Sequence, residues 1–274
     1  MHLHWLARAR NPPARDRQHR APVAAFQQQQ RQCGPPRNER DHARALGYTV
    51  VDAATAIATH LNKVLRENAA DLLSHDEVQQ LLDKLAVKSP KLVEDLIPAK
   101  LSLGVMTRTL QSLLNDAVSI RDMRTIVETL SEVSARTQDP EQLNALVRPR
   151  LGRLIVQGMV DDKEVLSVMT LEPGLEQLLH NVIVQQDQGQ GVVMEPGLAE
   201  RLFAALRDGA KQVESLGHAA VLVVSPAIRP WLARSVRSRV NELVVLSYGE
   251  IPDDQVVNVI HTVHAETSKS EATR

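Results

Sequence analysis

The segment VSIRDMRTIVETLSE, residues 118–132, decides how the surrounding chain folds. Its apolar residues recur at spacings of three and four, so they lie on one face of a helix and the charged residues lie elsewhere. These apolar residues are Ile120, Met123, Val127 and Leu130. Ser119 and Asp122 have the spacing of a capping box, so we expect Ser119 to cap this helix. Residues 101–114 and 143–155 are also helical in period, and the three segments together predict a compact helical subdomain.

The composition indicates a soluble chain with aliphatic cores. Of the 274 residues, 43% are hydrophobic but only 2% are aromatic, so Leu, Val, Ile and Ala must fill one large or two ordinary domains. No apolar run approaches the roughly 18 to 20 residues needed to cross a bilayer. The single cysteine, Cys33, excludes an internal disulfide and a Cys-based zinc site, which suits a reducing compartment.

Residues 1–46 differ from the rest of the chain. They contain nine arginines against three acidic residues, a net charge of +6, which leaves −7 for the remainder because the whole chain carries −1. With five prolines, the run Gln27–Gln30 and no helical or strand period, this segment is expected to be disordered. One interpretation is a basic arm for nucleic acid or anionic lipid. The interpretation we favour is an artefactual leader, such as an out-of-frame translation.

Order is expected to begin at Gly47. Residues 47–52 read as a short strand, after which Asp52 caps a helix. The apolar positions of that helix are Ile57, Ala58, Leu61, Val64, Leu65 and Leu72. Ser74 and Glu77 form a second capping box, Pro90 suits a first helical turn, and Pro149 should kink or divide the helix that contains it.

After Gly158 the pattern changes to alternating strands and helices. Apolar strands are predicted at 165–171, 219–224, 243–246 and 256–264, with helices at 173–186, 196–216 and 227–240. Two buried strands separated by one helix form a parallel crossover unit. The predicted fold class is therefore α+β and mainly helical, a helical subdomain followed by an α/β subdomain with a small mixed sheet.

No catalytic, cofactor or metal motif emerges from the chain, so we predict no enzyme. A P-loop, H-E-x-x-H and G-x-S-x-G are all absent from the sequence. Ser225 follows a strand, but it lacks the flanking glycines of a nucleophile elbow, so a helix cap is favoured over a hydrolase. Three further candidates are favoured to be ordinary surface features: the loop Gly189-Gln-Gly191 rather than a dinucleotide site, the solvated histidines His261 and His264 with Glu266 rather than a metal site, and the solvated acids Asp161, Asp162 and Glu164 rather than a cation site. The best candidate for a charged contact surface is the basic run Arg229, Arg234, Arg237 and Arg239, although a solvated helix face is favoured.

Ten segments carry a resemblance to a known family. They are GYTVVD (47–52), ATHLNKVL (58–65), LSHDEVQQLLDKL (73–85), PKLVEDLIP (90–98), VSIRDMRTIVETLSE (118–132), LGRLIVQ (151–157), LEPGLEQLL (171–179), EPGLAERL (195–202), VLVVSPAIRPWLAR (221–234) and VVLSYGEI (244–251). Together they resemble the cytoplasmic domain of the FlhA (FHIPEP) family, membrane proteins of the flagellar type III export gate. Their common order over nearly all of residues 47–264 makes the resemblance specific, whereas residues 1–46 match nothing in it.

The resemblance implies an interaction protein without cofactors. Family members form a nine-membered homo-oligomeric ring at the cytoplasmic face of the bacterial inner membrane. There they meet other export-apparatus proteins and dock flagellar export chaperones with their substrates. Their four subdomains imply that residues 47–72 are a remnant of the first and second subdomains, 73–152 form the helical third, 153–264 form the α/β fourth, and 265–274 are a disordered tail. The chaperone-docking threonine of the family falls on Thr59.

The chain also departs from the family pattern. The membrane part and most of two subdomains, including the acidic and aromatic residues that complete the docking hollow, would precede Gly47. We therefore expect a truncated domain that leaves Thr59 with half a site and binds chaperones weakly or not at all. The alternative function, a nucleic-acid-binding protein that uses the Arg-rich leader, is opposed by the net charge of −7 after residue 46.

Overall fold

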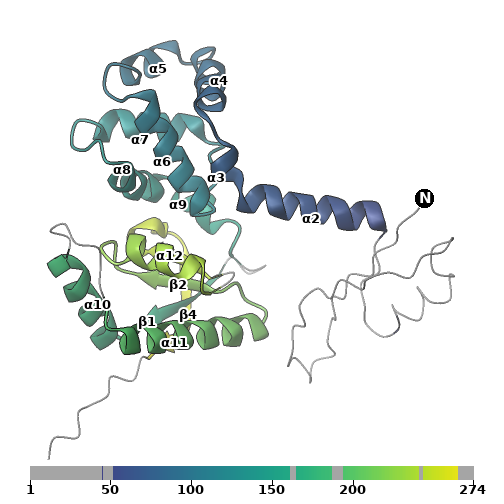
Figure 1. The fold of residues 1–274 in the computed structure, drawn as a ribbon. Helices are drawn as coiled ribbons and strands as arrows, with labels where there is room; N and C mark the ends of the chain where they lie inside the picture. Colours follow the sequence, from purple (N-terminus) through teal and green to yellow (C-terminus); the bar gives the residue numbers. More distant parts are fainter. Residues whose placement is uncertain (1–44, 46–51, 161–164, 187–193, 241–242, 265–274) are drawn as a thin grey trace, which may run out of the picture. The chain divides into compact units, whose positions relative to one another are not determined.

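The computed structural model describes residues 45, 52–160, 165–186, 194–240 and 243–264 (Figure 1). The chain divides into two compact units, Met1–Ala69 and Ala70–Arg274, each of which is described by itself. The predicted leader apart from residue 45, nearly all of the predicted strand at 47–52 and the tail lie outside the described residues. So do several of the weaker candidates, namely Asp161, Asp162, Glu164, Glu266 and the Gly189-Gln-Gly191 loop.

The first unit contributes one long described helix, α2 (Ala53–Glu67). Asp52 caps it as predicted, because its Oδ1 accepts a hydrogen bond of 2.7 Å from the backbone N–H of Thr55. The prediction of a helix that continues to Leu72 is wrong. α2 ends at Glu67, its C-cap Asn68 donates a side-chain hydrogen bond to the carbonyl of Val64, and a short helix α3 (Ala69–Leu72) follows. None of the α2 residues is buried.

The second unit begins with a group of helices (Figure 1). They are α4 (His75–Ala86), α5 (Pro90–Leu96), α6 (Leu103–Asn115), α7 (Met123–Val133), α8 (Pro140–Val147), the 3-10 turn η1 (Arg148–Leu151) and α9 (Gly152–Val156). Their apolar faces share one core, in which residues such as Leu82, Leu110 and Ile126 are fully buried. The capping box at Ser74 and the helix start at Pro90 are confirmed, and the predicted break at Pro149 falls in η1 between α8 and α9. We refer to α3–α9 as the helical part.

The predicted capping residue of the central helix is wrong by three positions. α7 begins at Met123 and its cap is Asp122, not Ser119. The Asp122 carboxylate accepts from both the backbone N–H and the hydroxyl of Thr125, at 3.1 and 2.7 Å. Ser119 makes only a 3.4 Å contact with the backbone N–H of Arg121. The capping-box spacing was present, but the acidic residue satisfies the helix N-terminus better than the hydroxyl three residues earlier.

This assignment predicts a contrast between two alanine variants. Asp122→Ala should lower the free energy of unfolding of the second unit by about 1 kcal/mol, because one helix N–H loses its acceptor. Ser119→Ala should change it by a few tenths of that amount. Urea unfolding followed by circular dichroism measures both, and a larger loss in Ser119→Ala than in Asp122→Ala would contradict the assignment.

The rest of the second unit is a four-stranded sheet with three long helices, the sheet part. Its strands are β1 (Val165–Leu171), β2 (Val221–Val224), β3 (Val244–Ser247) and β4 (Val256–Val263), and its helices are α10 (Pro173–Gln186), α11 (Pro196–Ser215) and α12 (Arg229–Arg237), with the 3-10 turn η2 (Tyr248–Glu250) after β3. The strand order is β3-β2-β1-β4, and all three pairings are parallel. The α+β, mainly helical class is confirmed, but the described sheet is parallel rather than mixed because every link between its strands is a crossover.

Alternation along the strands buries both faces of the sheet. Val221 and Val223 of β2 face the core of the helical part, whereas Leu222 and Val224 pack against the core that α10, α11 and α12 form. Such two-sided burial explains why β2 reads as a continuous apolar run. β4 lies at one edge of the sheet, and three of its valines, Val256, Val257 and Val259, are exposed.

Candidate interaction site

Thr59, the predicted docking residue, lies on the exposed surface of α2. The apolar stripe of the same helix is exposed as well, with Ile57 57% and Leu61 54% exposed. Because each helical residue turns by about 100°, Thr59 lies roughly 160–200° around the axis from Ile57 and Leu61. The threonine and the stripe therefore occupy opposite sides of α2, and one flat partner cannot contact both.

The hydroxyl of Thr59 differs from those of the buried helical threonines. Thr107, Thr109 and Thr129 each donate to the carbonyl four residues earlier, at 2.9, 2.9 and 2.7 Å. Within the described residues no such bond is seen for Thr59. Its hydroxyl is open to solvent or to a partner.

Ser225 lies at the carboxyl end of β2 and lacks the geometry of a nucleophile. Its backbone N–H donates to Glu176 Oε1 at 2.8 Å, and the Tyr248 hydroxyl donates to Glu176 Oε2 at 3.2 Å. The Ser225 hydroxyl is buried and bonds to no base in the described part of the chain. The predicted helix cap is also wrong, because the N-cap of α12 is Ile228, and Ser225 contributes its carbonyl, which accepts from the N–H groups of Ile228 and Arg229.

The two candidate histidines take part in packing and in a surface contact with a carboxylate. His264 Nδ1 lies 3.2 Å from Glu172 Oε2, with both side chains about half exposed. The His261 ring packs so closely on Gly209 of α11 that a Cβ there would lie 2.9 Å from it. Among the described residues no three His, Cys, Asp or Glu side chains are placed to hold a metal ion.

The arginines of α12 and its C-terminal end, predicted as a candidate charged surface, are occupied within the chain. Arg234 pairs with Glu141, Arg237 pairs with Asp116, and Arg239 lies 4.7 Å above the ring of Phe203. Arg229 is buried. Phosphates would have to displace these partners, so this helix is not a ready nucleic-acid surface.

A cluster of charged side chains joins the helical part to the sheet part. It consists of Asp116, Arg148, Arg229, Arg237 and Glu250, called the charge cluster below. Arg148 Nη2 lies 2.6 Å from Glu250 Oε2, and Arg148 Nη1 lies 3.4 Å from Asp116 Oδ2. Arg229 Nη1 lies 2.7 Å from Asp116 Oδ2, and Arg237 Nη2 lies 2.9 Å from Asp116 Oδ1. One carboxylate therefore meets three guanidinium groups.

Neutral side chains donate further hydrogen bonds to the buried carboxylates of the charge cluster. The side chains of Arg148 and Glu250 are only 1% and 3% exposed. The Ser247 hydroxyl donates to Glu250 Oε1 at 2.9 Å, and the Asn144 amide donates to Asp116 Oδ2 at 3.1 Å. Two buried atoms, Arg148 Nε and Asn144 Oδ1, have no hydrogen-bond partner in the described part of the chain. The arrangement is dense but not fully satisfied.

The arginines set the ionisation of Asp116. Burial by itself would raise the pKa of this carboxyl, but the charges of Arg229 and Arg148 and the hydrogen bonds of Arg229 and Asn144 outweigh it, so the pKa lies below its ordinary value. Burial lowers the pKa of Arg229, and the nearby charge of Arg148 lowers it further, against the opposing effect of Asp116 and Glu250. A guanidinium still stays protonated at any pH at which the protein folds.

The lowered pKa of Asp116 predicts that the difference in unfolding free energy between the native chain and Asp116→Asn depends on pH. Because the folded pKa of Asp116 is depressed below 3.8, its contribution is complete above the unfolded value and is lost as the pH falls through the folded value. The difference in unfolding free energy between the two proteins should therefore shrink when urea unfolding is repeated at about pH 3 instead of about pH 6. An equal gap at both pH values would contradict the depressed pKa.

Sequence reasoning missed the charge cluster as a unit. Its members are distant in the chain, with sequence separations of 102 from Arg148 to Glu250 and 121 from Asp116 to Arg237. The available signal was local: Arg148 interrupts the apolar face of α8 and η1, and Arg229 stands among the apolar residues before Trp231. A charge at an otherwise apolar position needs a buried partner, but the partner cannot be named from spacing.

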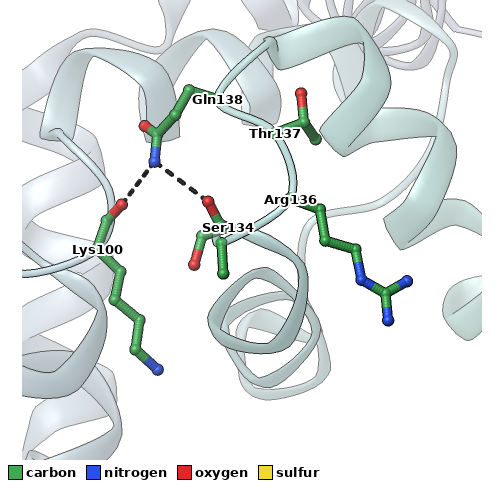
Figure 2. A pocket seen from close by; sticks show the side chains of 6 residues that line it. Lys100, Ser134, Arg136, Thr137 and Gln138 are labelled. Atoms are coloured by element: carbon green, nitrogen blue, oxygen red, sulfur yellow. Dashed lines mark hydrogen bonds between the residues drawn. The ribbon is translucent and has the colours of Figure 1, made fainter.

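A shallow hollow of about 470 Å³ lies beside the turn between α7 and α8. Lys100, Arg136, Thr137 and Gln138 line it, and Gln138 Nε2 donates to the carbonyls of Lys100 and Ser134 (Figure 2). The charged ends of Lys100 and Arg136 point to different sides in Figure 2, and the Lys100 ammonium donates to Ser131 Oγ at 3.0 Å. The hollow therefore presents no convergent pair of cations to an anion.

Comparison with known proteins gives consistent matches. The sequence profile of the FHIPEP family matches residues 9–256. That match begins inside the Arg-rich segment 1–46, so the prediction that this segment matches nothing in the family is wrong from residue 9 onward. The "Flagellar biosynthesis protein FlhA" of Escherichia coli is 43% identical over 224 residues, 82% of this chain and 32% of that protein. The chain thus spans about a third of the length of such relatives.

Solved structures agree with the fold. The nonameric SctV-C of EPEC has a TM-score of 0.72 and 26% identity, and the match covers 83% of this chain and 68% of that one. The Chlamydia pneumoniae CdsV protein in the structure of its complex with CdsO has a TM-score of 0.74, covering 83% and 66%, but at 21% identity this likeness speaks for the fold alone. In the described part of this chain, no helix is both long and apolar enough to traverse a bilayer.

Proposed function

Because the chain belongs to the FHIPEP family, we propose that it acts in a type III protein export apparatus as part of the cytoplasmic domain of the export gate. The match to this family over most of the chain carries the proposal. The proposed role is one of interaction rather than catalysis, and the family match supports it. Its place would be the cytoplasmic face of the bacterial inner membrane.

The proposed partners are flagellar export chaperones with their substrates, other export-apparatus proteins and further copies of the chain. The nonameric relative supports assembly into a ring, and the CdsV structure containing CdsO makes contact with apparatus proteins a reasonable extension. Thr59 is the proposed docking residue. Its exposed hydroxyl, which is not used by its own helix in the described structure, supports this choice.

A pull-down with purified chaperone–substrate complexes tests the docking part. We expect weak binding by the full chain, reduced by roughly tenfold in Thr59→Asp, which is about 1.4 kcal/mol of binding free energy. Ala204→Asp adds the same charge at an exposed position of α11 and should leave binding unchanged. Equal loss in both variants, or no loss in either, would remove Thr59 from the proposal.

A segment exchange tests the wider assignment independently. Residues 52–264 replace the matching segment of the E. coli relative, and secretion of flagellin and swimming are measured in a strain that lacks its own copy. Partial restoration of both is expected. Normal accumulation of the hybrid protein without any secretion would count against a role in export.

A further inference from the structure

The charge cluster draws its members from both parts of the second unit. Asp116 caps the C-terminus of α6 and Arg148 begins η1, both in the helical part. Arg229 and Arg237 lie on α12, and Glu250 ends η2, both in the sheet part. Every ion pair of the cluster that involves Asp116 or Arg148 crosses between the parts, except the 3.4 Å pair that these two residues make with each other.

The apolar contacts between the two parts do not fix an angle by themselves. The core of the helical part continues into Leu166, Val168, Val221, Val223 and Leu246 of the sheet. Apolar burial depends on area and not on direction, so small rotations of one aliphatic surface on the other change it little. Hydrogen-bonded ion pairs are directional, because a guanidinium and a carboxylate must meet within the geometry of their donors and acceptors.

The turn that holds Asp116 is strained. Ala117 has φ of 57°, in the left-handed region that a glycine normally occupies at this position after a helix. Its backbone N–H donates to Leu114 O and the next N–H, of Val118, donates to Leu113 O, both at 2.9 Å, which closes the C-terminus of α6. The strained residue, Ala117, directly follows Asp116, so the strained turn also positions the Asp116 carboxylate against three arginines.

Net stability is a poor explanation for this cluster. Removing charges from water costs more than an ion pair returns unless every group is satisfied, and Arg148 Nε and Asn144 Oδ1 have no partner in the described structure. In some other proteins, buried ionic or polar groups select one arrangement among several of similar energy. Three features of this cluster favour the same role: its ion pairs are directional, the turn at Ala117 that holds Asp116 is strained, and two of its buried polar atoms have no hydrogen-bond partner in the described structure.

We propose that the charge cluster is an orientation device that selects one packing angle between the helical part and the sheet part. The shared aliphatic core holds the two parts together, and the pairs of Asp116 and Glu250 with the three arginines determine how they are turned. A partner that contacts both parts then meets a fixed surface. Loss of the cluster leaves the parts attached but free to adopt further angles.

The experiment measures the distance between spin labels on the two parts. Labels are attached to Val87→Cys in the helical part and Leu216→Cys in the sheet part, both exposed positions, in a full chain that carries Cys33→Ser. The main variant replaces four cluster members by apolar residues of similar size: Asp116→Leu, Arg148→Met, Arg229→Met and Glu250→Leu. We expect its thermal midpoint to be equal or higher, with a distance distribution about twofold broader than in the unmodified cluster, or with a second maximum.

Two further variants keep the test decisive. Arg237→Gln removes only the half-exposed arginine, so folding should be retained and the distribution should broaden to a smaller degree. Arg150→Gln breaks an exposed pair with Glu132 outside the cluster and should leave the distribution narrow. Distributions as narrow as the native one in both the fourfold variant and Arg237→Gln would overturn the proposal. If the fourfold variant does not fold, a narrow distribution in Arg237→Gln overturns it alone.

Discussion

Replacing Asp116 by asparagine should lower the free energy of unfolding of the second unit by about 3–5 kcal/mol. The amide keeps the shape of the side chain but removes the charge that Arg148, Arg229 and Arg237 share. Glu250 alone then faces two buried guanidinium groups, and an uncompensated buried charge is among the most destabilising changes a folded protein can suffer. Thermal or urea unfolding of the purified variant measures the loss.

An exposed ion pair provides the matched control. Glu132→Gln also exchanges a carboxylate for an amide opposite an arginine, Arg150, but both side chains are about two-thirds exposed. This change should cost less than about 1 kcal/mol, because solvent screens the pair. Losses of similar size at Asp116 and Glu132 would show that the cluster behaves like ordinary surface charge.

The second large effect is expected at Gly152, the first residue of α9. A Cβ at this position would lie 2.3 Å from the carbonyl oxygen of Glu250 and 3.2 Å from its carbonyl carbon. Both are backbone atoms, so no side-chain rotation relieves the clash. Gly152→Ala should therefore lower the free energy of unfolding by about 1–3 kcal/mol, or somewhat more if η2 cannot move.

Gly174→Ala is the control for this variant, because Gly174 also lies in the first turn of a helix, α10, and a Cβ there meets no atom within 4 Å. Alanine has the higher helix propensity, so this exchange should be neutral or stabilising by up to about 1 kcal/mol. Equal destabilisation by the two exchanges would mean that the close approach of α9 to η2 does not decide the outcome. Equal stabilisation would mean the same.

Local signals predicted most of the fold. Asp52, the Ser74–Glu77 capping box and Pro90 each mark a helix start that the structure has, because capping satisfies backbone N–H groups within a few residues of the cap. The apolar strands of the sheet part were found for a related reason, since two-sided burial leaves an uninterrupted apolar run. The cap of α7 was misplaced because Ser119 and Asp122 are both good capping residues and spacing alone does not choose between them.

Long-range partners could not be predicted. Nothing near Arg148 in the sequence indicates that Glu250 will lie 2.6 Å away, and nothing near Gly152 indicates the carbonyl that excludes a side chain there. The parallel arrangement of β1 with β4 was likewise missed, because it depends on crossover direction and not on the pattern of either strand. Thr59 was chosen as the docking residue only because of the family resemblance, and its docking role stays a prediction.

The sheet order also governs how the chain can fold during synthesis. Among the strands in the described residues, β1 is the first to leave the ribosome, yet its longest pairing is with the last of them, β4, with Val165 opposite Val256. At about 5–20 residues per second, the ribosome needs roughly 5 to 18 s to make the intervening chain. The helical segments, which precede β1, can pack during this delay, while β1 has one unpaired side and must avoid other nascent chains. Until β4 has been made, this edge of β1 is therefore a point at which the nascent chain can associate wrongly.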